Sequence, residues 1–167
     1  MSTRVRQGVK PFREDTHEGA HRAMVKKFYT GIGSRHTPDH ILLQMREFAY
    51  AAAQCGWTLR SGAANGADSA FELGCDDAGG DKEIYIPWSR FNGHSSTLYP
   101  PTDGALKIAA EIHPAWKVLR QSAKLLVARN MHQVLGYSLG VSSHAVVCWT
   151  ADGCESFRTY GRTTGGT

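Results

Sequence analysis

The 167-residue sequence lacks the features that mark membrane and secreted proteins. No apolar run approaches the ~20 residues of a membrane-spanning helix, and the polar, basic N-terminus has no apolar stretch typical of a signal peptide. The four cysteines have no CxxC or zinc-site spacing, and His36, His94, His113 and His144 are scattered along the chain and are expected to be surface or core histidines. These absences predict a cytoplasmic chain with reduced thiols, no metal site and no membrane contact.

The standard nucleotide-binding motifs are also missing, since neither GxGxxG nor GxxxxGK[ST] occurs. The net charge of +4 is compatible with anionic ligands but does not by itself indicate nucleic acid. A hydrophobic content of 41% and a charged content of 20% are typical of one soluble globular domain. Any ligand site must therefore be found from local patterns.

The N-terminal segment differs from the rest in charge. Residues 1–27 hold seven Lys or Arg against three acids and show no clear periodicity. We predict a basic arm over residues 1–26, either disordered or functional, followed by one domain over residues 27–167.

Strand-like and helix-like patterns alternate through this domain. Strands are predicted at residues 27–32, 57–60, 83–86 and 144–149, and helices at residues 38–54, 67–78, 105–112 and 115–135. Thr37 and Pro38 are predicted as the N-cap and first residue of the first helix. The alternation predicts an α/β, Rossmann-like parallel sheet of four to five strands, in the order 3-2-1-4, flanked by helices.

Two Gly-rich turns follow the first two strands, in YTGIGSRHTP (residues 29–38) and RSGAANGADSAFE (residues 60–72). Glycine lets the backbone approach a ligand closely, and a helix N-terminus offers unpaired N–H groups and a partial positive charge. The polar side chains of these turns are Ser34, Arg35, Asn65 and Asp68. Two such turns at one sheet edge favour a ligand site over purely architectural turns.

Two of these polar positions, and one polar pair further along the chain, have specific expected chemistry. Arg35 either binds a phosphate bidentately or caps the first turn from the surface. Asp68 either caps the second helix or accepts a hydrogen bond from a ribose hydroxyl, and the cap is favoured. Arg129 and Asn130 interrupt an apolar helical pattern, and because buried polar groups need partners, they are site candidates.

A long aromatic loop, WSRFNGHSSTLYPPTDG (residues 88–104), follows the third strand. Loops of this length in compact domains are usually functional or disordered. Trp88, Phe91 or Tyr99 either stacks on a bound base or packs as part of the core or a lid.

Several stretches together resemble the phage and bacterial relatives of DNA-processing protein A in the SLOG superfamily, which also contains the LOG nucleotide hydrolases. They are YTGIGSRHTP, GWTLRSGAANGADSAFE, KEIYIPW, VARN with QVLG, and VVCWTADG. The resemblance implies a Rossmann-like domain that binds a nucleotide or a nucleic-acid phosphate. The positions that match the family loops are Gly31, Gly33, Ser34 and Arg35, then Ser61, Gly62, Gly66 and Asp68, and finally Arg129 with Asn130.

The sequence departs from the LOG pattern at its third loop. TTGG at residues 163–166 resembles the start of PGGxGTxxE, but the given sequence ends before the glutamate. We therefore expect no catalytic residue and no N-glycosidase activity by the family route, and Glu72 is not a replacement. The absence of a last strand leaves residues 144–149 as a sheet edge, which predicts a homo-oligomer.

Three functions remain in competition at this stage. The favoured one is non-catalytic binding, for sensing or sequestration, of a small phosphorylated nucleotide-type ligand. The alternatives are a nucleoside-monophosphate phosphoribohydrolase-like enzyme and a single-stranded-DNA-binding recombination mediator. The DNA alternative is weakened because residues 68–83 hold six acids against one lysine. The predicted site residues are Gly31, Gly33, Ser34, Arg35, Ser61, Gly62, Asn65, Gly66, Asp68, Trp88, Arg129 and Asn130.

Overall fold

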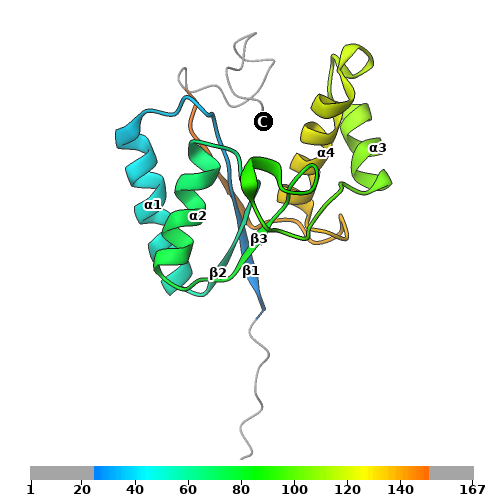
Figure 1. Cartoon of the computed structure of the whole chain (residues 1–167). Coiled ribbons are helices and arrows are strands. Elements are labelled where there is room, and N and C mark those ends of the chain that lie inside the picture. The colour runs from blue at the N-terminus through cyan, green and yellow to red at the C-terminus, as the bar shows by residue number, and fades with distance from the viewer. Residues whose placement is uncertain (1–24, 151–167) are drawn as a thin grey trace, which may run out of the picture.

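A computed structural model describes residues 25–150, and it contains one parallel sheet with helices on both faces (Figure 1). The basic arm up to residue 24, Cys154 and the third loop lie outside the described residues. The strands are β1 (Lys27–Gly31), β2 (Trp57–Ser61), β3 (Lys82–Ile84) and β4 (Ala145–Val147). The helices are α1 (Asp39–Gln54), α2 (Ala67–Asp77), α3 (Asp103–Ile112) and α4 (Gln121–Leu135), with short 3-10 helices η1 (Phe91–Gly93) and η2 (Trp116–Val118).

The sheet has the strand order β3-β2-β1-β4, and all three pairings are parallel. The predicted α/β class and order 3-2-1-4 are confirmed. In register, Thr30 of β1 pairs with Arg60 of β2, which pairs with Glu83 of β3. Among the described strands β4 is an edge, and the homo-oligomer stays a prediction.

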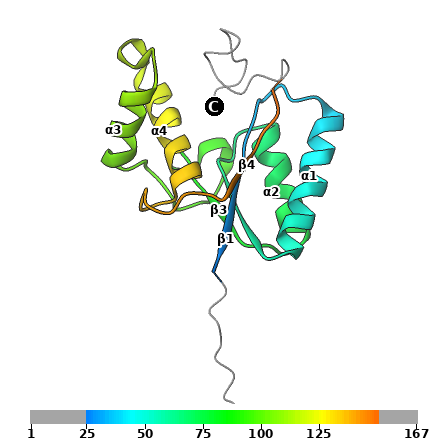
Figure 2. The same cartoon turned by 180° about the vertical axis from the view of Figure 1, so that it is seen from behind.

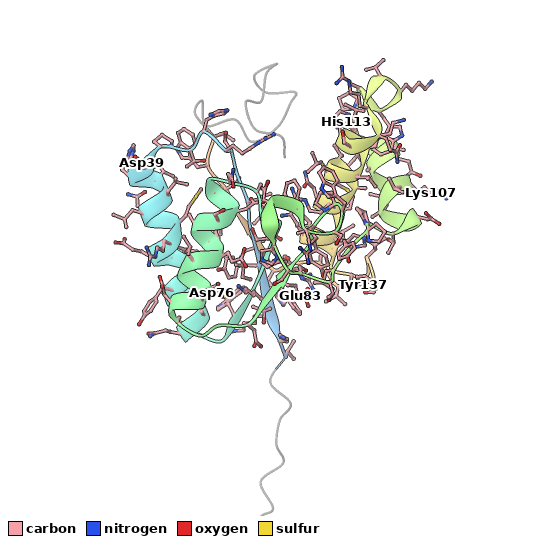
Figure 3. All side chains as sticks on the ribbon, in the orientation of Figure 1. Asp39, Asp76, Glu83, Lys107, His113 and Tyr137 are labelled. Atoms are coloured by element: carbon pink, nitrogen blue, oxygen red, sulfur yellow. The ribbon has the colours of Figure 1, made fainter. Side chains whose placement is uncertain are left out.

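The two faces of the sheet are covered by different helix pairs. Helices α1 and α2 lie on one face and α3 and α4 on the other, as the front and back views show (Figures 1 and 2). Asp39 and His113 mark the end of the molecule to which the strands point, and Glu83 and Tyr137 lie toward the opposite end (Figure 3). Among the described residues, no helix combines the length and the apolar character of a membrane span.

The face toward α1 and α2 holds the apolar core. Successive strand side chains point to opposite faces, so Tyr29, Leu59 and Ile84 pack together with Met45 of α1 and Phe71 of α2. Each fully buried side chain of this size contributes roughly 1.5–3 kcal/mol of stability. This face fixes the strand positions.

The face toward α4 is buried but polar. The Thr30 hydroxyl donates to the Gln133 carbonyl at 2.6 Å, and Arg60 Nε donates to Glu83 Oε2 at 2.7 Å. The Tyr85 hydroxyl donates to the same Glu83 oxygen at 2.8 Å. Because buried polar groups are stable only when they are paired, these bonds hold α4 and the neighbouring strands in one arrangement.

Two sequence-based boundaries are wrong. The predicted helix over residues 115–135 is broken, because Leu119 and Arg120 are extended and separate η2 from α4. This turn lets Trp116 pack against the α3–α4 cluster, where the Lys124 ammonium lies 5.5 Å from its ring centroid. The N-cap of α1 is Pro38, and the Thr37 hydroxyl donates instead to the Ser34 carbonyl at 2.8 Å.

The long loop after β3 is held against the sheet. Asn92 Nδ2 donates to the Ala63 carbonyl at 2.9 Å, and the Ser96 hydroxyl donates to the Ile84 carbonyl at 2.6 Å. Leu98 forms a parallel bridge with Tyr85. The loop therefore places its first turn, η1, at a fixed position beside the carboxyl end of β2.

Candidate functional site

A cleft of about 290 Å³ lies where the loops after β1 and β2 meet η1 and α4. Its lining residues are Ile32, Gly33, Arg35, Ala64, Asn65, Asp68, Phe91, Asn92, Ala123, Leu126, Val127, Arg129, Asn130 and Gln133. The order of the sheet reverses at β1, and ligands of open α/β sheets bind at such points, outside the carboxyl ends of the strands. The cleft is therefore the principal site candidate.

The two Gly-rich loops pack directly on each other. The Ser34 carbonyl accepts a hydrogen bond from the Ala67 N–H at 3.4 Å. Gly66 has φ +85, and a Cβ there would lie 2.7 Å from the Ser34 oxygen. Glycine adopts this conformation readily, and it places no side chain in the contact between the loops. The loop contact thus sets the width of the cleft on this side.

Asp68 occupies the position at which the loops gather N–H groups. Its carboxylate accepts from the Ala64 N–H at 3.3 Å and from the Gly33 N–H. Asp68 Oδ2 also lies 3.5 Å from Arg129 Nη1. The N-cap of α2 is Gly66 and not Asp68. The Ala67 N–H donates to the Ser34 carbonyl, and the Ser69 N–H donates to the Ala64 carbonyl. The Asp68 carboxylate therefore occupies N–H groups of the two Gly-rich loops, which the sequence pattern suggested as donors to a phosphate.

Arg129 reaches the same point from α4. Its side chain is buried, and Nη1 donates to the Gly62 carbonyl and, at 3.4 Å, to the Tyr85 carbonyl. A Cβ on Gly62 would collide with Arg129 Nη1, so glycine is required there by the guanidinium. Burial lowers the pKa of Arg129, and the Asp68 charge opposes that shift. The pair forms the floor of the cleft.

Two buried donors of residues that line the cleft have no hydrogen-bond partner within the described part of the chain. These donors are Arg129 Nε and Gln133 Nε2. The two residues are 6% and 1% exposed, respectively. An unsatisfied buried donor costs about 1–3 kcal/mol. Both atoms are enclosed by protein, so the folded chain itself bears this cost.

The rim and walls differ from the floor. Arg35, Asn65 and Asn92 are exposed at the rim. The walls are formed by Phe91 and by the apolar residues Ala123, Leu126 and Val127 of α4. The Arg129 guanidinium carbon lies 5.9 Å from the Phe91 ring centroid. The cleft thus combines apolar walls, a floor formed by the Asp68–Arg129 pair and a cationic rim.

The structure brings six of the twelve predicted site residues to this cleft. They are Gly33, Arg35, Asn65, Asp68, Arg129 and Asn130. Five others support it from behind, since Gly31, Ser34, Ser61, Gly62 and Gly66 form the loop backbone and its contacts. Trp88 is absent from the lining and packs its ring edge against Phe91 at 5.2 Å between centroids.

The sequence-based prediction missed Gln133 and Asn92. Gln133 lies four residues after Arg129, and residues at that spacing share a helix face, so the signal was present in the sequence. Asn92 follows from the folding of the long loop, which local patterns do not reveal. Glu72 lies outside the cleft and binds Lys82 and His94, each at 2.8 Å.

Burial raises the pKa of the Asp68 carboxyl to about 6, against the lowering effect of Arg129 and the loop N–H groups. The folded state then holds the proton more tightly than the unfolded chain, whose Asp pKa is ~3.9. We expect the Asp68 contribution to stability to be greatest below pH ~4 and to fall as pH rises through 6, by about 2–3 kcal/mol. Urea unfolding from pH 4 to 7 measures this. Asp68→Asn should remove this component, and an unchanged pH profile in Asp68→Asn would contradict it.

Comparison with known proteins adds no assignment: no family model, curated protein or solved structure matches the chain. Within residues 25–150, no group of three or more His, Cys, Asp or Glu side chains is placed to hold a metal ion.

Proposed function

We propose that the cleft binds a small phosphorylated nucleotide-type ligand and that the protein senses or sequesters this ligand without transforming it. The observation that carries the proposal is the meeting, in one cleft, of the two Gly-rich loops, the apolar walls from η1 and α4, and the exposed Arg35. A nucleotide has a flat ring that apolar walls accommodate, and phosphate oxygens that accept hydrogen bonds from a guanidinium. The resemblance to the SLOG superfamily supports the same ligand class.

Binding without catalysis is favoured by the acid–base groups of the cleft. Hydrolysis of an N-glycosidic bond needs a proton donor for the leaving base and a group that activates water or stabilises the cation. Asp68 is the single carboxylate among the described lining residues, and it is engaged with Arg129 and two loop N–H groups. No histidine lines the described cleft.

A thermal-unfolding series with nucleoside mono-, di- and triphosphates and cyclic nucleotides tests the proposal. A ligand at a hundredfold excess over its dissociation constant is expected to stabilise the fold by about 2.7 kcal/mol. Arg129→Lys should weaken the effect, because lysine lacks the guanidinium whose Nη1 donates to the Gly62 and Tyr85 carbonyls and holds the loop after β2 in place. Arg46→Gln is the control and should bind normally, because Arg46 is an exposed residue of α1 that pairs with Asp77 of α2 and does not line the cleft.

Two other results would replace the proposal. Release of a free base above a buffer blank would establish the phosphoribohydrolase alternative. Failure of every nucleotide, together with salt-sensitive binding of single-stranded oligonucleotides, would establish the DNA alternative.

A further inference from the structure

The two faces of the sheet carry opposite charge. Helices α1 and α2 together contain six Asp or Glu residues and one Arg, a net formal charge of −5. The segment from the start of α3 to the end of α4, residues 103–135, contains five Lys or Arg residues and two acids, a net charge of +3. One charge on each side belongs to the buried Asp68–Arg129 pair. The remaining charges favour contact between unlike faces of two copies.

The α3–α4 hairpin ends in an exposed apolar tip, residues 112–120. The hairpin projects at the end of the molecule to which the strands point, where His113 is labelled (Figures 1 and 3). Ile112 and Val118 are 62% and 83% exposed. Lys117 and Arg120 are exposed beside them, and the tip contains no acid. Exposed aliphatic side chains flanked by cations are typical of a surface that binds an acidic partner with an apolar recess.

Backbone hydrogen bonds hold this tip in one shape. The His113 N–H donates to the Ala109 carbonyl at 3.0 Å, and the Trp116 N–H donates to the His113 carbonyl at 3.1 Å. The Val118 N–H donates to the Ala115 carbonyl at 3.1 Å. Trp116 also packs its side chain into the α3–α4 cluster. A surface that is already ordered loses less conformational entropy on binding, so the tip is suited to docking.

An apolar groove of about 360 Å³ lies between α1 and α2, on the acidic face. The two helices cross closely at Gly74, where a Cβ would collide with the Arg46 carbonyl oxygen. The groove lies on the N-terminal side of this crossing. Its apolar lining residues are Leu42, Leu43, Ala70 and Leu73, and Asp39 lies at its edge. Leu43 and Leu73 are each more than half exposed.

We propose that the tip of one copy binds in the α1–α2 groove of a second copy of this chain. The groove is large enough for the two aliphatic side chains of the tip. Val118 then lies against Leu73, and Lys117 and Arg120 lie beside the acids of α1 and α2. A tip cannot reach the groove of its own copy, because the two lie on opposite faces of the sheet (Figures 1 and 2).

The contact is heterologous, because the tip and the groove are different surfaces. Such contacts form rings or open chains, or a dimer when two copies exchange both tips. Part of the attraction is between exposed charges, so the association should weaken as ionic strength rises. The contact does not involve the ligand cleft and is independent of the proposed function.

Analytical ultracentrifugation of the full chain from about 1 to about 100 μM, the range of weak interfaces, tests the proposal. The unmodified protein should associate. Val118→Asp places an acid on the tip, and Leu73→Asp places a charge in the groove, so each should associate about tenfold more weakly or less. Both positions are exposed, so both variants should keep the unmodified protein's circular dichroism spectrum.

An equal mixture of the two variants gives the sharpest result. The Leu73 variant has an intact tip and the Val118 variant has an intact groove, so the mixture should form 1:1 pairs although neither variant associates alone. A mixture that stays monomeric would mean that tip meets tip or groove meets groove, which overturns the proposal. A monomeric unmodified protein over the whole concentration range would also overturn it.

Val146→Asp is the control, on the exposed edge strand β4. It should associate as the unmodified protein does. Association that is lost in this variant and kept in the Val118 and Leu73 variants would place the interface at the β4 edge and overturn the tip–groove contact. Unchanged association in Leu73→Asp alone would exclude the groove as the partner surface.

Discussion

Replacing Arg129 by methionine is expected to lower the free energy of unfolding by about 3–5 kcal/mol. Methionine fills much of the same volume but cannot donate to the Gly62 and Tyr85 carbonyls. It also leaves the Asp68 carboxylate buried without its counter-charge. A domain of this size is stable by roughly 5–15 kcal/mol, so the loss is a large share of the total.

The double variant Arg129→Met with Asp68→Asn separates the two causes of this loss. Asparagine keeps an acceptor for the Ala64 N–H but carries no charge, so the double variant should be more stable than Arg129→Met alone. Chemical denaturation of both variants at pH 7 provides the measurement. Equal stabilities would mean that the carboxylate is not the source of the penalty and that Arg129 acts through its carbonyl contacts.

The fold was predictable because its signals are local. Apolar runs such as residues 27–32 are each followed by a Gly-containing turn and a helical pattern, and parallel βα units connect in few ways. The alternation therefore predicted a parallel α/β sheet, and the expected strand order 3-2-1-4 is the one observed. The break between Val118 and Gln121 was not predictable, because it depends on the packing of Trp116 against α3.

The cleft was predictable only in part, for the same reason. Gly33, Arg35, Asn65 and Asp68 follow strands directly, so their meeting at one sheet edge could be inferred from topology. Their roles could not be inferred, because pairing depends on three-dimensional distance. Asp68 accepts a hydrogen bond from the loop N–H group of Ala64. It is also paired with Arg129 of α4, and local sequence patterns do not reveal that contact.

Replacing Gly66 by alanine is expected to lower stability by about 3 kcal/mol or more. Gly66 has φ +85 and ψ −122, a region that residues with a Cβ rarely adopt and that costs roughly 1–3 kcal/mol. The added Cβ would also lie 2.7 Å from the Ser34 oxygen and 2.9 Å from Arg35 Cα, and such crowding adds about 1–3 kcal/mol. The strain acts on the contact that joins the two loops of the cleft.

Gly56→Ala is the matched control for this prediction. Gly56 also has a positive φ, +74, but a Cβ there meets nothing within 4 Å. Its variant should therefore lose only the backbone cost of about 1–2 kcal/mol and should bind ligand as the unmodified protein does. The Gly66 variant should, in addition, lose affinity for the nucleotide found in the thermal series, because the Ser34–Arg35 segment must move away from the second loop. Equal destabilisation and equal affinity in the two variants would show that the loop contact does not shape the cleft.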